Sequence, residues 1–205
     1  MTGAVGWLLI ALALAVIVVR RRSTAIVVVA TQSLVIALVA LAEASHRSGE
    51  FMSSALALLA KAIFIAAVLG WSVRRTRQDH PITEALAAPV RLAVTAAIAI
   101  TAAALVPRFG LPSLSEEHAT VALVVIGITA VIVRKATLFQ VLGLLVAENG
   151  IAFAATAVAG GMPMVIDLGV IFDVVIVLSV ATAFHERIFR EFGSGDATVL
   201  RGLRD

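Results

Sequence analysis

The sequence contains no cysteine among its 205 residues. Without thiolates, the chain itself cannot form a disulfide or hold an iron–sulfur cluster, a nickel–iron centre or a thiolate zinc site. Other chemical motifs are lacking too: none of the four histidines stands in an HExxH spacing, and there is neither a glycine-rich phosphate loop nor a GxSxG elbow. We therefore expect no cofactor and no catalytic site in this chain, so that any redox chemistry belongs to a partner.

Charge is scarce as well. Only 14% of the residues are charged and 61% are hydrophobic, and the mean hydropathy of +1.07 is far above that of a soluble domain of this length. The net charge of +3 comes from basic residues that gather in short clusters between apolar runs, a pattern typical of cytoplasmic loops. The composition predicts an all-α, polytopic helix bundle whose partner is the lipid bilayer and not a nucleic acid.

Seven apolar runs are long enough, or nearly so, to cross the roughly 30 Å hydrocarbon core as helices. They lie near residues 4–19, 24–45, 52–73, 86–106, 118–133, 136–158 and 164–184. With seven spans, the basic clusters share one side: Arg20 to Arg22, then Arg74, Arg75 and Arg77, then Arg134 with Lys135, and finally the arginines of the tail. The positive-inside rule makes that side cytoplasmic. We predict a multi-pass protein of the cell inner (cytoplasmic) membrane, with its N-terminus outside and its C-terminus in the cytoplasm.

A faint internal repeat suggests how the spans are grouped. Shifted by 113 positions, Arg21 falls on Arg134 and Thr24 on Thr137, which favours a parallel duplication of three helices, although apolar helices also match one another by chance. We divide the chain into a three-helix membrane unit (1–84), a linking helix with an external loop (85–117), a second three-helix unit (118–190) and a cytoplasmic tail (191–205).

Two of the apolar runs, the sixth and the seventh, are interrupted by acids away from their ends. Glu148 lies about halfway along the sixth predicted span and Asp173 about a third of the way into the seventh, with Asp167 six residues earlier. A carboxylate in hydrocarbon costs roughly 2.5 to 3.5 kcal/mol, so such residues normally face a bundle interior and mark an ion or proton route. We predict a proton pathway through Glu148 and Asp173. Hydrogen bonds that only fix helix packing are the alternative, and Asp167 is equally suited to an interfacial or capping role.

Three further polar residues accompany these acids. Lys61 lies near the middle of the third predicted span, where its ammonium requires a partner and could bias the carboxylates electrostatically. Asn149 follows Glu148 directly, and Glu43 lies near the outer end of the second span. We treat Asn149 and Glu43 as supporting polar residues, with anchoring at the interface as the alternative role for Glu43.

The second half of the chain has a recognisable order of features. A short helix leads to the basic turn Arg134–Lys135, a middle helix carries Gly143, Leu144, Glu148 and Asn149, and a last helix carries Asp173. In this respect residues 119–190 resemble the K-type subunit of the proton-pumping NADH dehydrogenase (complex I) and the C subunit of Mrp-type sodium/proton antiporters. The K-type acid would fall at Leu145, and Glu148 is displaced from it by about one helical turn.

The full length, and the run LFQVLGLLVAENGI in particular, resembles component E of the hydrogenase-4 and formate hydrogenlyase-like complexes. This resemblance implies a non-catalytic membrane-arm subunit of an oxidoreductase complex. Its implied partners are antiporter-like membrane subunits, a quinone-site-like membrane subunit and a cytoplasmic nickel–iron hydrogenase-like module. Three alternatives stay open from the residues alone: a subunit of a cation/proton antiporter, a purely structural membrane-arm subunit, and an independent carrier.

Overall fold

The computed structural model describes residues 2–44, 49–76 and 87–157, with four isolated positions beyond them. Within these ranges the chain forms helices and no strands. The helices are α1 (Thr2–Val18), α2 (Arg22–Ala44), α3 (Gly49–Thr76), α4 (Ala88–Leu105), α5 (Leu114–Val133) and α6 (Thr137–Ala157). Their bounds agree closely with the first six predicted spans. The seventh predicted span, 164–184, lies outside the described residues apart from its four isolated positions.

Five of these helices are long and apolar enough to cross a membrane, namely α2 to α6, and α1 is a shorter apolar helix. The chain is therefore a multi-pass membrane protein. Because each helix must satisfy its own backbone groups in lipid, its bounds fall where the apolar run meets polar or proline residues. Pro89 stands in the first turn of α4, and Arg134 ends α5 in an extended conformation.

The start of α5 differs from the prediction. We expected this span to begin near residue 118, but the helix starts at Leu114 because Ser113 caps it, accepting a hydrogen bond of 3.3 Å from the backbone N–H of Ser115. Glu116 and Glu117 thus lie in its first turn, where carboxylates suit the positive end of the helix dipole.

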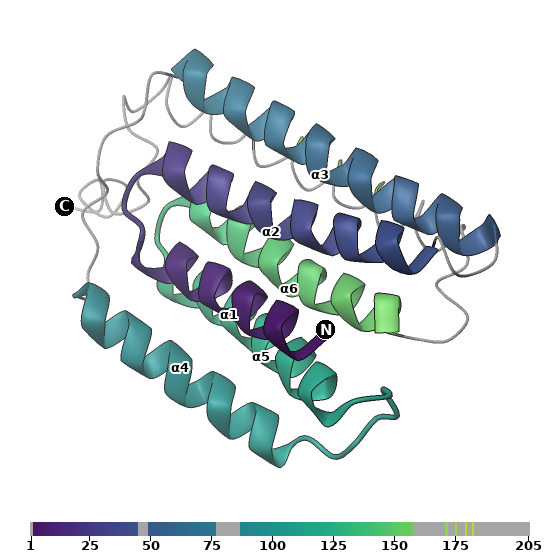
Figure 1. Cartoon of the computed structure of the whole chain (residues 1–205). Helices are drawn as coiled ribbons and strands as arrows, with labels where there is room; N and C mark the ends of the chain where they lie inside the picture. Colours follow the sequence, from purple (N-terminus) through teal and green to yellow (C-terminus); the bar gives the residue numbers. More distant parts are fainter. Residues whose placement is uncertain are drawn as a thin grey trace.

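The six helices run side by side along one common direction (Figure 1). α1, α5 and α6 lie in the middle, α2 and α3 form a pair on one side, and α4 packs against α5 and α1 on the other. The connection from α1 to α2 and the connection from α5 to α6 lie at the same end of the bundle (Figure 1). We call it the arginine end, because these connections contain Arg20, Arg21 and Arg134. That this end faces the cytoplasm stays a prediction.

The most extensive helix contact joins α5 to α6, and glycines make it possible. A Cβ on Gly143 of α6 would lie 2.8 Å from the carbonyl oxygen of Gly127 in α5 and 2.9 Å from the backbone nitrogen of Val131. Only a residue without a side chain permits such an approach, the close-packed geometry that small residues give to membrane helices. Gly150 approaches α5 in the same way, since its Cβ would lie 2.9 Å from the Cβ of Leu123.

The helix bounds also agree with the predicted repeat. A shift of 113 carries α1 onto residues 115–131, within α5, and α2 onto residues 135–157, which nearly coincide with α6. The counterpart of α3 would fall on residues 162–189, which lie almost entirely outside the described ranges. The duplication therefore stays a prediction.

Candidate functional site

Lys61 and Glu148 form an ion pair in the middle of the bundle. The Nζ atom of Lys61, on α3, lies 2.7 Å from Oε1 of Glu148, on α6, and the two side chains are 3% and 16% exposed. The buried ammonium and the largely buried carboxylate each lose hydration, and a close opposite charge offsets that cost. The expectation that Lys61 needs a partner is thus met by the same carboxylate that the sequence singled out.

Next to this pair lies a hydrogen-bonded cluster of three uncharged polar side chains. Asn149 Nδ2 donates to Gln32 Oε1 at 3.1 Å and to Ser33 Oγ at 2.9 Å, while Ser33 Oγ lies 3.1 Å from Asn149 Oδ1. Gln32 Nε2 donates in turn to the backbone carbonyl of Leu9 in α1, at 3.0 Å. All three side chains are buried, so the cluster links α6 to α2 and α1 at the level of the ion pair.

The direction of these side chains follows from the geometry of α6. Gly143 and Gly150 are seven residues apart and both face α5, which turns the intervening dipeptide Glu148–Asn149 toward the other side of the helix. Successive residues of a helix point about 100° apart. Glu148 therefore reaches α3, where it forms the ion pair, and Asn149 reaches α2, where it joins the uncharged polar cluster.

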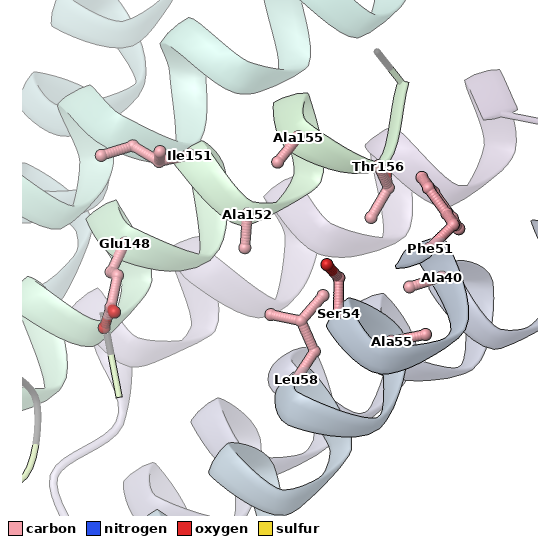
Figure 2. Close-up of a pocket in the computed structure, with 10 residues that line it drawn as sticks. All are labelled: Ala40, Phe51, Ser54, Ala55, Leu58, Glu148, Ile151, Ala152, Ala155 and Thr156. Carbon is pink, nitrogen blue, oxygen red and sulfur yellow. The ribbon is translucent and has the colours of Figure 1, made fainter. Parts of the chain in front are cut away.

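A cavity of about 80 Å³ begins at Glu148. Its wall is formed by residues of α2, α3 and α6: Ala40, Phe51, Ser54, Ala55, Leu58, Glu148, Ile151, Ala152, Ala155 and Thr156. In Figure 2, Glu148 stands at one end of this cavity and Phe51 and Thr156 at the other. The carboxylate thus borders open space, on a face of α6 where Leu144 and Ile151 are also exposed.

Arg134 is a second buried charge, at the arginine end. Its guanidinium donates to the carbonyl oxygens of Ile17 at 3.1 Å and Val19 at 2.7 Å, and it lies 3.5 Å from the ring centre of Phe139. A cation suits the negative end of a helix dipole, so Arg134 caps the C-terminus of α1. The sequence assigned Arg134 to a basic loop facing water, whereas the side chain is only 1% exposed.

The opposite end holds Glu117, which orders the α4–α5 connection. Its Oε1 atom accepts hydrogen bonds from the backbone N–H groups of Gly110 at 2.9 Å and Leu111 at 3.0 Å, and Arg108 Nε lies 3.4 Å from Oε2. Gly110 adopts a positive φ of 93°, which glycine tolerates. These contacts give Glu117 a structural role at this loop.

The structure thus brings together some of the predicted site residues and not others. Glu148, Lys61 and Asn149 meet at one level, whereas Glu43 lies in the last turn of α2, ten residues beyond Ser33 and hence about 15 Å farther along the axis. Asp173 and Asp167 lie outside the described residues. Gln32 and Ser33 were missed, although two polar residues in the middle of the run AIVVVATQSLVIALVA were a visible signal.

At this level the described residues bring together an acid, a base and uncharged polar groups. Within the described ranges, no group of three or more histidine, aspartate or glutamate residues is placed to hold a metal ion. A carboxylate next to an ammonium, with a cavity on one side and hydroxyl and amide groups nearby, can bind and release a proton as the charge around it changes.

Comparison with known proteins gives one informative relative. The chain is 30% identical to the uncharacterized protein Rv0085 of Mycobacterium tuberculosis (strain ATCC 25618 / H37Rv) over 149 residues, which cover 68% of this chain and 68% of that protein. No protein-family model and no solved structure matches the chain. The extent of the shared region places both proteins in one family.

Proposed function

The chain belongs to the same family as the protein Rv0085 of Mycobacterium tuberculosis, and we propose that it is a proton-conducting membrane-arm subunit of a complex-I-like hydrogenase or formate hydrogenlyase-like assembly. In this role it catalyses no redox step itself. The redox module, the antiporter-like subunits and the quinone-site-like subunit are partners that lie beside it in the cytoplasmic membrane. Support for the assembly comes from the resemblance of LFQVLGLLVAENGI and of the helix order to component E of such complexes.

The observation that carries the proposal is the ion pair of Lys61 and Glu148 at mid-depth of the bundle. Packing alone is served by uncharged groups, as the cluster of Asn149, Gln32 and Ser33 does between α6, α2 and α1. An acid and a base held 2.7 Å apart in a low-dielectric interior respond strongly to any charge that arrives nearby. Such a pair is suited to couple a distant electrostatic event to proton movement.

The proposed mechanism uses this response. When a charge change in a neighbouring subunit weakens the attraction of Lys61, the Glu148 carboxylate takes up a proton. When the attraction is restored, it releases the proton to the next carboxylate, for which Asp173 is the candidate from the sequence. Lys61 acts as the electrostatic bias and Glu148 as the group that carries the proton.

A structural subunit is the second candidate, and one observation favours it. The pair and the neighbouring cluster together join α1, α2, α3 and α6, so they could serve only to hold the bundle in the shape that neighbouring pump subunits require. In that case, removing the charge of Glu148 would lower the yield of the assembled complex and leave the coupling in the remaining complexes intact.

The substitution Glu148→Gln separates these candidates, because it keeps the size of the side chain and removes its ability to carry a proton. In inside-out vesicles that contain the assembled complex, we expect proton uptake per electron transferred to fall, while complex yield and electron transfer persist. Glu43→Gln, the same change in the last turn of α2, is the matched control and should pump normally. Unchanged pumping in Glu148→Gln would remove Glu148 from the mechanism.

A further inference from the structure

The cavity at Glu148 extends toward one end of the bundle only. From α3 it is lined by Phe51, Ser54, Ala55 and Leu58, all of which precede Lys61, and from α6 by residues that follow Glu148 up to Thr156. Thr156 is eight residues beyond Glu148, so the cavity wall covers about 12 Å along the helix axis. It therefore leads from the ion pair toward the end where α3 begins and α6 ends (Figure 1).

Small side chains leave this space open, and side-chain oxygen atoms lie along its wall. Four of the lining residues are alanines, and Figure 2 shows Leu58 and the hydroxyl of Ser54 between Glu148 and Thr156. The Thr156 hydroxyl donates to the carbonyl of Phe153 at 2.7 Å, which leaves its oxygen able to accept a hydrogen bond. A volume of about 80 Å³ exceeds the roughly 10–15 Å³ that one water molecule requires.

The half of α6 on the other side of Glu148 is packed. Phe139, Leu142 and Val146 are fully buried, and Leu145 is 3% exposed. The contact between Gly143 and Gly127 also falls in this half, where Leu144, one turn from Glu148 on the same face of α6, is 46% exposed. Among the described residues, therefore, the buried part of α6 toward the arginine end is closely packed, whereas the cavity extends from Glu148 toward the opposite end.

We propose that this cavity holds a short chain of water molecules, which connects the Glu148 carboxylate to the end of the bundle opposite the arginine end. Ser54 and Thr156 supply the hydrogen-bonding groups that an otherwise apolar cavity needs to stay hydrated. Glu148 then exchanges protons with one side of the membrane only. By the distribution of basic residues, that side is the external one.

This inference deepens the proposed function and rests on it for the identity of the ion that uses the path, but the hydration itself is tested separately. The chain has no cysteine, so single cysteines can be introduced without altering a background residue. Ser54→Cys, Ala152→Cys and Thr156→Cys place thiols along the cavity. Ala13→Cys, in the closed core of α1, and Ile128→Cys, on an exposed face of α5, are matched controls outside it.

The probe is Ag⁺, which is small enough for a water-sized path and reacts with hydrated thiols. Sealed vesicles of known orientation are exposed to it from one side, and unreacted thiols are then counted with a maleimide after unfolding. We expect loss of maleimide labelling at positions 54, 152 and 156 from the external side only, and none at positions 13 and 128. Full labelling at 54 and 152 after external Ag⁺, or equal loss from both sides, overturns the inference.

A filling variant provides the second arm. Ala155→Leu places a larger side chain into the cavity without touching the ion pair, so it should protect Ser54→Cys from Ag⁺ and reduce proton translocation in the assembled complex. If Ag⁺ reacts as expected but Glu148→Gln pumps normally, the water path stands and the proposed function fails. If Glu148→Gln stops pumping but the cavity thiols never react, the function stands and the water path fails.

Discussion

Replacing Lys61 by methionine would remove one half of the ion pair and leave the other half buried. Lys61→Met keeps most of the length and apolar volume of the side chain, so the cavity and the helix contacts change little. The loss falls on Glu148, whose side chain is 16% exposed and borders the small cavity. The variant thus measures what the Lys61 ammonium contributes to holding the Glu148 carboxylate at this depth.

The expected magnitude follows from the burial of both partners. Removing one member of a buried ion pair typically costs about 3–5 kcal/mol, because the remaining charge is uncompensated. Glu148→Gln should cost less, since the amide oxygen still accepts a hydrogen bond from Lys61. The double variant removes both charges of the pair, so its loss of unfolding free energy should fall short of the sum of the two single losses by about 2 kcal/mol or more.

The assay is reversible unfolding in mixed detergent micelles. Unfolding is monitored as the loss of the helical circular dichroism signal with increasing concentration of the denaturing detergent. The wild type, the two single variants and the double variant form a double-mutant cycle. If the losses in unfolding free energy of the two single variants add up to that of the double variant within about 0.5 kcal/mol, the two groups do not interact energetically. That result would refute the reasoning that the 2.7 Å contact is what permits both charges to be buried.

Other contacts predict further effects in the same unfolding assay. Gly143→Leu should destabilise the bundle by about 1–3 kcal/mol, because the new side chain overpacks against Gly127. Gly70→Ala should be neutral or slightly stabilising, because nothing lies within 4 Å of the added Cβ. Equal effects of the two substitutions would contradict the close backbone contact at Gly143. Arg134→Met removes two hydrogen bonds from a charged donor and should cost about 3 kcal/mol or more, and Arg134→Lys should recover only part of it. Asn149→Leu removes the hydrogen bonds to two buried partners, Gln32 and Ser33, and should lower the free energy of unfolding by about 1–3 kcal/mol. An unchanged unfolding midpoint would show that the polar cluster does not stabilise the bundle.

Sequence reasoning was most successful where the bilayer constrains the chain. A helix must span roughly 30 Å and satisfy its own backbone, so apolar runs and the polar residues between them define the helices within a few residues. The start of α5 was the largest deviation. There, Ser113 and the acidic pair look like loop residues by hydropathy, although the cap and the helix dipole make them part of the helix.

The individual polar residues of the site were predictable, but their pairing was not. Glu148 and Lys61 stand out because charges are rare in hydrocarbon, but the sequence suggested only that Lys61 could bias the carboxylates and not which of them it contacts. Which residues meet depends on the rotation of each helix. That rotation is set by the glycine contact between α5 and α6, which a hydropathy pattern does not reveal.

Arg134 illustrates the same limit in another way. A basic residue in a loop between spans is normally read as a solvated charge, and the positive-inside rule uses it as such. Here the guanidinium instead turns into the bundle, where two backbone carbonyls at the end of α1 bind it. Only the spatial neighbourhood of α1 and α5, which are more than a hundred residues apart in sequence, makes this role visible.

The central claim, that the chain works as a membrane-arm subunit of a hydrogenase-like assembly, is tested most directly by isolating it with its partners. The tagged protein would be purified from native membranes in mild detergent, and every co-purifying chain identified by mass spectrometry. We predict antiporter-like membrane subunits together with the large subunit of a nickel–iron-type hydrogenase. Recovery of the chain alone would contradict the claim, and antiporter-like subunits without any redox partner would contradict its coupling to a redox module.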